Sequence, residues 1–593
     1  MTFHQVSLIV ILISLLVLLV WGRWRYDVVA LGALFVAGLL GVVPQAELFS
    51  GFGNPATITV VLVLIISFGL TRSGAVDYVL PIIEPLQSKP FLHIAALTFL
   101  AAFLSMFMNN VGALALLMPI AIQSTTKAGR PPATVLMPLS FGSILGGLVT
   151  LIGTPPNILV ASYREEVTGE SFSMFDFSPV GGVVALCGIF FMLIVGWRLV
   201  KVRKQTAGMD LFEIEEYLFE LKVTKESELI GQTVGTMKKM LVEAKMDLLS
   251  YEHGKKMVRV VSADNDRELA DNMRVMVQGP HDEVQKFAKD NNLGMHTAMN
   301  GMQALLHSED KEFSEVVITP NSRLIGATPS SSNFNNRFKV NLLAVSRSGK
   351  PHRQRLRDFK FAAGDVLLLY GEEDKLQDAI SRIDCYPLAR RMLSTGQSRK
   401  ALEALVIFVS GILLVAAGVL SIQLALGLAT VAMALRGIIP VKEFYDGVDW
   451  PVVVLLGAMI PLGAALETTG VMDLVVSGFL SVAGGLPPAV ILALLLIVTM
   501  TVSDVLNNAA TAILMAPIAY NIAIFLNLNP DAFLMAIAVG ASCAFLTPIG
   551  HQNNALIMGP GGYQFGDYWR MGLPLEIVIV SVSVPMLLIV FPL

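Results

Sequence analysis

Ser105-Met-Phe-Met-Asn-Asn-Val-Gly-Ala-Leu-Ala-Leu-Leu-Met-Pro119 is the stretch that decides the fold of this 593-residue chain. A near copy, Ser503-Asp-Val-Leu-Asn-Asn-Ala-Ala-Thr-Ala-Ile-Leu-Met-Ala-Pro517, keeps the serine, the asparagine pair and the proline at one spacing. Amide side chains are costly in such an apolar run unless they line a cavity or bind a ligand. The two copies therefore predict one site that is assembled from two related halves.

The composition is that of a membrane protein that carries a polar insert. Hydrophobic residues make up 54% of the chain, and 59 of its 88 charged residues (42 basic plus 46 acidic) lie between positions 201 and 400. We therefore expect a multi-pass protein of the cell membrane with a soluble region between two apolar blocks. The apolar run 6–20 precedes no small-residue cleavage site and is expected to remain as a helix. The sequence has no basic tract, so no nucleic-acid partner is expected.

Motifs for catalysis or metal binding are missing from the sequence. Cys187, Cys385 and Cys543 stand far apart and match no metal or redox spacing. Neither the apolar blocks nor the insert carries a nucleophile–base pair or a phosphate-binding loop. We therefore expect no enzymatic activity and no cofactor.

An internal repeat relates the two apolar blocks. Residues 41–51 match residues 437–447 at an offset of 396, and the asparagine pairs follow at an offset of 398. Ile152–Asn157, Ile-Gly-Thr-Pro-Pro-Asn, matches Ile549–Asn554, Ile-Gly-His-Gln-Asn-Asn, at an offset of 397. An ordered series of matches over such a length indicates a duplication.

The repeat predicts a polytopic α-helical membrane protein of two inverted repeats, each with five transmembrane helices and one re-entrant hairpin at its asparagine pair. Helices are expected near residues 4–21, 26–44, 56–72, 133–162, 178–197, 400–418, 422–440, 452–467, 531–558 and 572–592, and hairpins at 91–127 and 487–526. The expected domains are a first membrane repeat (1–200), two inserted α+β domains (206–300 and 301–390) and a second membrane repeat (398–593).

The basic residues predict the orientation in the membrane. Lys127, Arg130, Arg436, Lys442 and Arg570 fall at predicted ends of spans and should face the cytoplasm. This assignment places residues 206–390 in the cytoplasm and both termini outside it.

The insert contains a second repeat. Leu229-Ile-Gly231 returns as Leu324-Ile-Gly326, and a strand-like run, Asp365-Val-Leu-Leu-Leu-Tyr, follows Ala-Gly364. The second copy resembles the TrkA C-terminal (RCK-C) domain, and the first is a weaker match because Asn272-Met-Arg replaces Gly-Asp. The resemblance implies small α+β modules that dimerise and bind a regulatory, nucleotide-like ligand. A dimerisation or folding module without a ligand stays open as the alternative.

The hairpins and the glycine motifs after them resemble the divalent anion/sodium symporter family, over both apolar blocks. Glycine lets a helix unwind and the prolines remove backbone donors, which frees carbonyls for a cation. The resemblance implies a homodimer, and two symmetric sodium sites. Their ligands would be Ser105, Asn109, Asn110 and Gly153 in one site, and Ser503, Asn507, Asn508 and Gly550 in the other. The expected substrate contacts are Asn110, Val111, Gly112, Thr154, Pro155, Asn157, Asn508, Ala509, Thr511, His551, Asn553 and Asn554.

The sequence departs from that family where hydroxyl groups bind carboxylates. Asn109 and Asn507 replace tip serines, and Val111 and Ala509 replace tip threonines. Members with an RCK-C insert resemble the sulfate-transporter branch. We therefore expect sodium-coupled symport of a small divalent anion, with sulfate as first choice and a dicarboxylate as the alternative.

Two titratable residues keep other functions open. Asp504 beside Ser503 and His551 in the second glycine motif are candidates for proton or cation coupling. A cation/proton antiporter of the same superfamily would use these two residues. A ligand-gated channel or a nutrient sensor, with the insert as its receiver, is the alternative of another class.

Overall fold

The structure, a computed structural model, divides into two compact units. One comprises Met1–Val202 and Arg390–Leu593, and the other is Arg203–Ala389. The structure describes residues 1–21, 24–73, 84–201, 218–244, 246–253, 256–259, 266–278, 281–297, 311–320, 322–348, 350–352, 359–388, 398–483 and 485–593. The domain boundaries expected at 206, 300, 301 and 390 lie outside the described residues.

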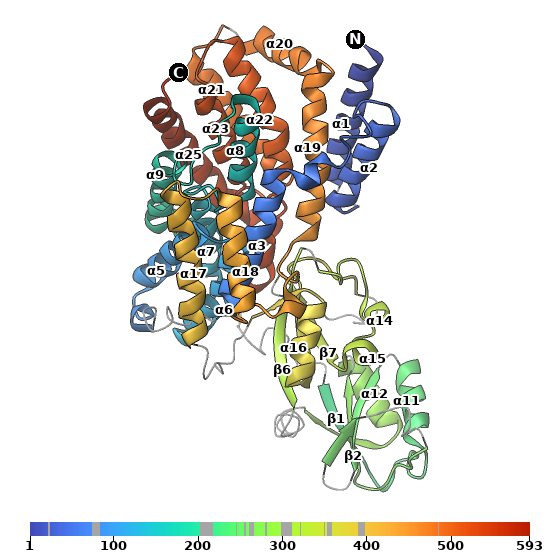
Figure 1. Ribbon diagram of the computed structural model, residues 1–593. Helices are drawn as coiled ribbons and strands as arrows, with labels where there is room; N and C mark the ends of the chain where they lie inside the picture. The colour runs from blue at the N-terminus through green and yellow to red at the C-terminus, as the bar shows by residue number, and fades with distance from the viewer. Residues whose placement is uncertain are drawn as a thin grey trace. The chain divides into compact units, whose positions relative to one another are not determined.

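The first unit is a helical bundle whose two halves have their helices in matching order (Figure 1). The first half has α1 (Phe3–Trp21), α2 (Tyr26–Leu39), α3 (Pro55–Arg72), α5 (Pro90–Ser105), α6 (Asn110–Lys127), α7 (Ala133–Gly146), α8 (Pro155–Thr168), α9 (Ser178–Phe191), a π-helical turn (Met192–Gly196) and α10 (Trp197–Leu199). The second half has α17 (Ser398–Ala416), α18 (Ile422–Leu435), α19 (Trp450–Thr468), α20 (Val471–Ala483), α21 (Pro488–Ser503), α22 (Asn508–Phe525), α23 (Pro530–Ser542), α24 (Gln552–Gly561) and α25 (Tyr568–Val590). Short 3-10 turns lie at Ser50–Gly53, Glu84–Leu86, Val441–Glu443 and Phe565–Asp567.

Several helices have the length and composition needed to cross a membrane. In the described part of the chain they are Pro55–Arg72, Ser178–Leu199, Trp450–Thr468, Asn508–Phe525 and Phe565–Val590. The expected spans 133–162 and 531–558 are each interrupted, as α7–α8 and α23–α24, at the glycine motifs. The expectation of a multi-helical membrane protein is thus confirmed.

Helix starts in the bundle carry residues that favour them. Proline occupies the first turn of α3, α5, α8, α21 and α23, where its missing N–H costs no hydrogen bond. The side chains of Asn54 and Asn529 cap α3 and α23 by accepting the N–H groups of Ala56 and Asp531. The hairpins use the same device.

Helices of one half pack against helices of the other half. α3 packs against α18 while α2 packs against α19, and α8 packs against α23 while α24 packs against α7. The hairpin α5–α6 lies toward the lower end of the bundle in Figure 1, and α21–α22 lies toward the upper end. Each half therefore completes the packing of the other.

The second unit contains two small antiparallel sheets with one strand order. The first sheet is ordered β3-β2-β4-β1-β5 and the second, read from its other edge, is β8-β7-β9-β6-β10. The first has β1 (Leu218–Val223), β2 (Asp247–His253), β3 (Lys256–Arg259), β4 (Arg274–Gln278) and β5 (Leu293–Thr297), with α11 (Val234–Glu243) and α12 (His281–Asp290). The second has β6 (Lys311–Ile318), β7 (Asn341–Arg347), β8 (Lys350–Pro351), β9 (Val366–Glu372) and β10 (Cys385–Pro387), with α14 (Pro329–Ser332), α15 (Phe334–Phe338) and α16 (Glu373–Arg382). The expected α+β insert is confirmed.

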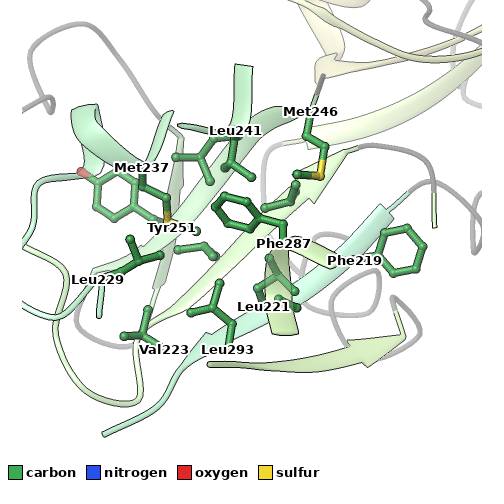
Figure 2. Packing of buried hydrophobic residues seen from close by; sticks show 14 of the residues in the cluster. Phe219, Leu221, Val223, Leu229, Met237, Leu241, Met246, Tyr251, Phe287 and Leu293 are labelled. Atoms are coloured by element: carbon green, nitrogen blue, oxygen red, sulfur yellow. The ribbon is translucent and has the colours of Figure 1, made fainter. Parts of the chain in front are cut away.

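Each sheet has its own hydrophobic core. Figure 2 shows the first, where Met237, Tyr251 and Phe287 gather on one face of the sheet. The leucines of the two Leu-Ile-Gly motifs, Leu229 and Leu324, are buried in the first and the second core respectively.

The two sheets also hold equivalent ion pairs with their charges exchanged. Arg274 in β4 donates two hydrogen bonds to Glu252 in β2, at 3.0 and 3.1 Å. Arg347 in β7 donates two to Asp365, next to β9, at 2.6 and 2.7 Å. Hydrogen bonds from Arg274 hold the pKa of Glu252 below its usual range. Two-point pairs of this kind fix strand positions more strictly than a single contact.

Candidate functional site

The first asparagine of each pair caps a helix. Asn109 Oδ1 accepts the N–H of Val111 at 3.2 Å, and Asn507 Oδ1 accepts the N–H of Ala509 at 2.9 Å. Both interactions satisfy a first-turn donor that the helix itself leaves unpaired. The amides of Asn109 and Asn507 therefore have a structural task at the tips of the hairpins.

The second asparagine of each pair meets the serine of its motif. Ser105 Oγ donates to Asn110 Oδ1 at 2.6 Å, and Ser503 Oγ, which donates to the carbonyl of Ala541 at 2.6 Å, lies 3.0 Å from Asn508 Oδ1. Both serines are fully buried, and Asn110 is 2% exposed. The five-residue spacing in the sequence thus joins the end of one hairpin arm to the start of the other, and two oxygen atoms meet beneath each tip.

The two interrupted helices, α7–α8 and α23–α24, are each held at the break by one asparagine. Asn157 Nδ2 donates to the carbonyls of Gly147 and Thr150 at 3.2 and 2.9 Å. Asn554 Nδ2 donates to the carbonyls of Ala544 and Thr547 at 3.1 Å each. These bonds replace those that helix unwinding leaves unmade, so that each break keeps a defined shape.

Two threonines that were not predicted as site residues join the breaks to the hairpin tips. The hydroxyl of Thr150 donates to the carbonyl of Met106, and that of Thr547 donates to the carbonyl of Asp504 at 2.7 Å. Both stand three residues before the glycine of their motif, in Thr-x-Ile-Gly. That repeated pattern could have identified them from the sequence.

Glycines permit close contact between each tip and its break. A Cβ atom at Gly147 would lie 2.5 Å from Asn110 Oδ1, and one at Gly550 would lie 2.8 Å from the Cα of Asp504. A Cβ atom at Gly153 would lie 2.9 Å from the Cα of Gly147. Contacts below 3.0 Å with the main chain exclude a larger residue at Gly153 and Gly550 without a backbone shift.

The two halves meet at the start of α24. His551 Nδ1 accepts the N–H of Asn553 at 3.1 Å and so caps α24, while His551 Nε2 lies 3.3 Å from Asn110 Nδ2. Asn553 Nδ2 donates to the carbonyl of Asn110 at 3.1 Å and to Ser143 Oγ at 2.6 Å. The start of α6 in the first half and the start of α24 in the second half therefore form one polar junction.

The remaining predicted contacts vary in what they can offer a ligand. The N–H groups of Val111 and Ala509 are occupied by the caps, and the hydroxyl of Thr511 donates to the carbonyl of Asn507 at 3.2 Å. A Cβ at Gly112 would lie 2.9 Å from Ser67 Oγ. These positions therefore serve the hairpins themselves.

The start of α8 differs, because no side chain caps it. Thr154 precedes this helix and makes no side-chain cap, and Pro155 follows it. Asn157 Oδ1 is buried without a hydrogen-bond partner among the described residues.

A pocket lies beside the hairpin arm α22. It holds about 530 Å³ including its mouth and is bounded by α3, α8, α19 and α22. Tyr163, Glu166 and Glu467 line it, and the Tyr163 hydroxyl donates to Glu467 Oε1 at 2.6 Å. The carboxylates give this pocket an acidic wall.

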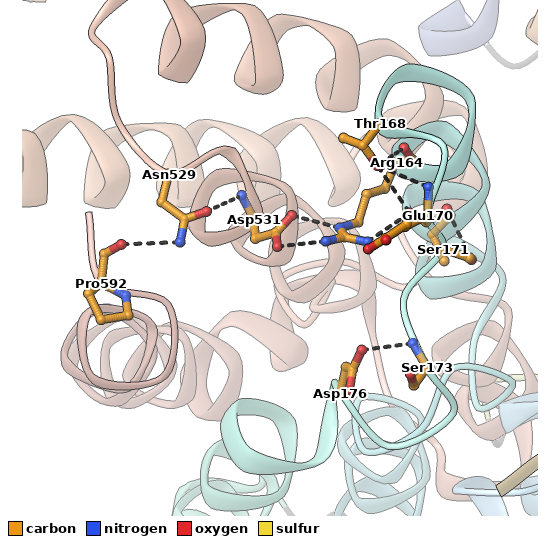
Figure 3. A network of polar contacts seen from close by, with 10 residues as sticks. Arg164, Thr168, Glu170, Ser171, Ser173, Asp176, Asn529, Asp531 and Pro592 are labelled. Atoms are coloured by element: carbon orange, nitrogen blue, oxygen red, sulfur yellow. Dashed lines mark hydrogen bonds and ion pairs between the residues drawn. The ribbon is translucent and has the colours of Figure 1, made fainter. Parts of the chain in front are cut away.

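An ion pair fixes α8 to the second half (Figure 3). Arg164 Nε and Nη2 donate to the two oxygens of Asp531, at the start of α23, at 2.7 and 3.0 Å. Arg164 Nη1 also donates to the carbonyl of Glu170, and the guanidinium lies 4.7 Å from the centre of the Phe172 ring. This pair holds together the two broken-helix units.

Comparisons with known proteins now give the family. Residues 16–524 match the model of the citrate transporter family (CitMHS). The chain is 29% identical to the uncharacterized transporter sll0640 of Synechocystis, over 98% of this chain and 97% of that one. It is 27% identical to the uncharacterized transporter YfbS of Escherichia coli, over 97% of both chains.

Two further matches have lower sequence identity. The chain is 25% identical to the probable sodium/sulfate cotransporter 3 of Chlamydomonas reinhardtii, over 55% of this chain and 38% of that one. The crystal structure of the YdaH transporter of Alcanivorax borkumensis matches with 14% identity and a TM-score of 0.40, over 93% of this chain and 87% of that one. With a family match over residues 16–524, this chain belongs to the citrate transporter family and is a multi-pass membrane transporter, not an enzyme.

Proposed function

We propose that the protein is a sodium-coupled symporter of a small divalent anion, with sulfate as its first substrate, and that it works by alternating access. The observation that carries the proposal is the junction of Asn110, His551 and Asn553, where helix starts from both halves meet. Two inverted repeats that share one site are the general plan of secondary transporters.

The chemistry of the junction suits an anion. Helix starts present unpaired N–H groups and the positive end of the helix dipole, which favour a negative charge without a fixed cation. The amide of Asn110 can add a side-chain donor, while both Nδ2 hydrogens of Asn553 already bind within the junction. Cotransporters of Chlamydomonas reinhardtii with this similarity are named for sodium and sulfate, which favours sulfate over larger anions.

The sodium sites are proposed at the two serine–asparagine contacts. Hydroxyl and amide oxygens meet there next to the carbonyls of the breaks, and sodium prefers hard oxygen ligands. Because Asn109 and Asn507 act as caps, their side chains would fix the tips, and Asn110 and Asn508 would carry the ligation.

A sodium-coupled organic carboxylate symporter is the second candidate. It is favoured by the description of the family, which names citrate. The missing tip hydroxyls at Val111 and Ala509 count against it.

Regulation and assembly follow the same reasoning. We propose that the insert is a cytoplasmic pair of RCK-C domains in a homodimer, on the strength of the strand order that its two sheets share. A nucleotide-like ligand of the insert would then adjust transport. Both termini are proposed to lie outside the cytoplasm.

The test is substrate selectivity in proteoliposomes. Uptake of radiolabelled sulfate is measured with an inward sodium gradient and with choline in its place, against unlabelled sulfate, citrate or succinate. The expected result is sodium-stimulated uptake that unlabelled sulfate inhibits and unlabelled citrate does not. Absence of sulfate uptake, together with sodium-stimulated uptake of radiolabelled citrate or succinate, supports the carboxylate symporter. Sodium-independent transport contradicts both.

A further inference from the structure

The pocket beside α22 has a largely apolar lining. It lies between α3 and α8 of the first half and α19 and α22 of the second half. Its inner end is formed by buried side chains, which are Leu159, Ala512 and Ala516. At about 530 Å³ including its mouth, the pocket has the size of small-molecule sites, which are mostly apolar and carry a few placed polar groups.

Two carboxylates stand at the mouth of this pocket, one from each half. Glu166 lies in α8 and Glu467 lies in α19, and both are exposed. The Tyr163 hydroxyl donates to Glu467 Oε1 at 2.6 Å and so fixes one oxygen of this carboxylate. Neither acid was among the predicted site residues, because a glutamate near a helix end is most often a solvated surface residue.

No basic side chain compensates these acids among the described residues. Arg164 lies on the same helix as Glu166, but its Nε and Nη2 atoms bind the two oxygens of Asp531. The other ion pairs in the described part of the membrane unit use neither Glu166 nor Glu467. The mouth of the pocket therefore carries negative charge without a counter-ion, which favours a cation.

The remaining polar side chains of the lining are already engaged. Ser162 Oγ donates to Asn54 Oδ1 at 3.1 Å, and the same oxygen accepts the N–H of Ala56 as the cap of α3. Sodium needs several hard oxygen ligands, which the apolar inner end does not supply. A neutral apolar ligand would leave the carboxylates without a partner, and an anion would be repelled.

We propose that this pocket binds an organic cation, namely an amine with a compact apolar body, and that the bound amine inhibits transport. An ammonium group offers three N–H donors, which Glu166, Glu467 and the Tyr163 hydroxyl oxygen can accept. The apolar body would cover the inner end of the pocket and leave water. The pocket shares no residue with the junction of Asn110 and His551, so only the inhibition rests on the transport function proposed above.

The origin of the walls explains the inhibition. An amine held between Glu166 and Glu467 bridges α8 of the first half and α19 of the second half. Alternating access requires contacts between the halves to change. A ligand shifts such an equilibrium toward the state that it binds better. The amine would therefore hold the halves in the arrangement in which this pocket exists.

Isothermal titration calorimetry of the purified full-length protein tests the pocket without any transport. Benzylamine is compared with benzyl alcohol and with benzoate, which carry the same ring with no charge and with a negative charge. Benzylamine should bind saturably and at least tenfold more tightly than either. Equal affinity for benzylamine and benzyl alcohol would show that the carboxylates do not select the ligand, and would overturn the proposal.

Substitutions separate the charge from the shape of the pocket. Glu467→Gln keeps an oxygen for the Tyr163 hydroxyl but removes the charge, and Ala464→Leu fills the mouth from an exposed lining position. Each should weaken benzylamine binding at least tenfold. Glu165→Gln is the matched control, because this exposed acid is the neighbour of Glu166 on α8 and does not line the pocket. Wild-type affinity in either pocket variant, or an equal loss in the control, would overturn the proposal.

Sodium-driven uptake of radiolabelled sulfate in proteoliposomes then tests the inhibition. Benzylamine should slow uptake by the wild type at least tenfold, and added sulfate should not relieve the inhibition. Glu467→Gln should transport sulfate and be at least tenfold less sensitive to benzylamine. Unchanged uptake at saturating benzylamine would overturn the inhibition. Absence of sulfate uptake in the wild type would count against the proposed substrate alone, and calorimetry would still decide whether the pocket binds the amine.

Discussion

His551 Nε2 lies 3.3 Å from Asn110 Nδ2, although 441 residues separate the two in the chain. His551 Nδ1 accepts the N–H of Asn553, so that the ring caps α24 with one nitrogen and touches the first hairpin with the other. A doubly protonated ring has no acceptor and would lose the cap. This geometry favours a neutral histidine that positions two helix starts.

Substitution of His551 tests this positioning role. Asparagine caps helices well and keeps an amide near Asn110, whereas alanine loses the cap at a cost of about 0.5–2 kcal/mol. His551→Asn should therefore retain more sulfate uptake than His551→Ala, at equal protein in the vesicles. Equal loss in both variants would mean that the imidazole itself is needed.

Gly147→Ala should damage the first half-site. The added Cβ would lie 2.5 Å from Asn110 Oδ1 and force this amide away from Ser105. We expect sodium-driven uptake to fall at least tenfold while the protein still folds. Gly182→Ala is the matched control, because a Cβ there meets no atom within 4 Å. Equal uptake by the two variants would show that the contact of Asn110 with Ser105 is dispensable.

Arg164→Lys should lower the stability of the membrane unit. Lysine cannot reproduce the two-point bond to Asp531 or the contact with Phe172. The expected cost is about 1–3 kcal/mol, seen as a lower thermal unfolding temperature of the purified protein. Arg382→Lys changes an exposed pair with Asp378 and should have almost no effect. A similar shift for both variants would contradict the structural weight given to Arg164.

Glu315 should make the stability of the insert depend on pH. Burial raises the pKa of this carboxyl from 4.5 to about 7. The folded state therefore holds the proton where the unfolded state releases it. The contribution of Glu315 to the free energy of unfolding is complete below about pH 4.5. It is lost as the pH rises to about 7, which lowers the free energy of unfolding by roughly 3 kcal/mol.

Urea unfolding of residues 203–389 at several pH values measures this effect. Glu315→Gln should remove the decrease between pH 4.5 and 7 and be more stable than the wild type at pH 8. Glu372→Gln, at an exposed position, should keep the wild-type profile. An unchanged pH profile in Glu315→Gln would assign the decrease to another group.

Much of the fold could be predicted from the sequence, because a pattern that is weak on its own becomes specific when it occurs twice. A lone Asn-Asn pair in an apolar run has several explanations, but Asn109-Asn110 and Asn507-Asn508 share flanking serines and prolines. The helix interruptions at Gly153 and Gly550 were foreseeable for the same reason, since glycine beside proline or polar residues is poorly suited to a helix interior.

Roles within the site were harder to predict. Spacing alone could not tell that Asn109 caps a helix while Asn110 faces Ser105, because neighbouring residues in a turn point in different directions. The contact between His551 and Asn110 likewise depends on how the two halves pack.

The measurement that tests the central claim most directly is sodium-driven uptake of radiolabelled sulfate by Asn110→Ala and Asn508→Ala, each in proteoliposomes beside the wild type. If two half-sites form one coupled site, each variant alone should lose uptake at least tenfold. Asn521→Ala is the control, since this amide on α22 donates to the carbonyl of Pro517, one turn earlier in its own helix. Full sodium-driven uptake in either asparagine variant would contradict a site built from both halves.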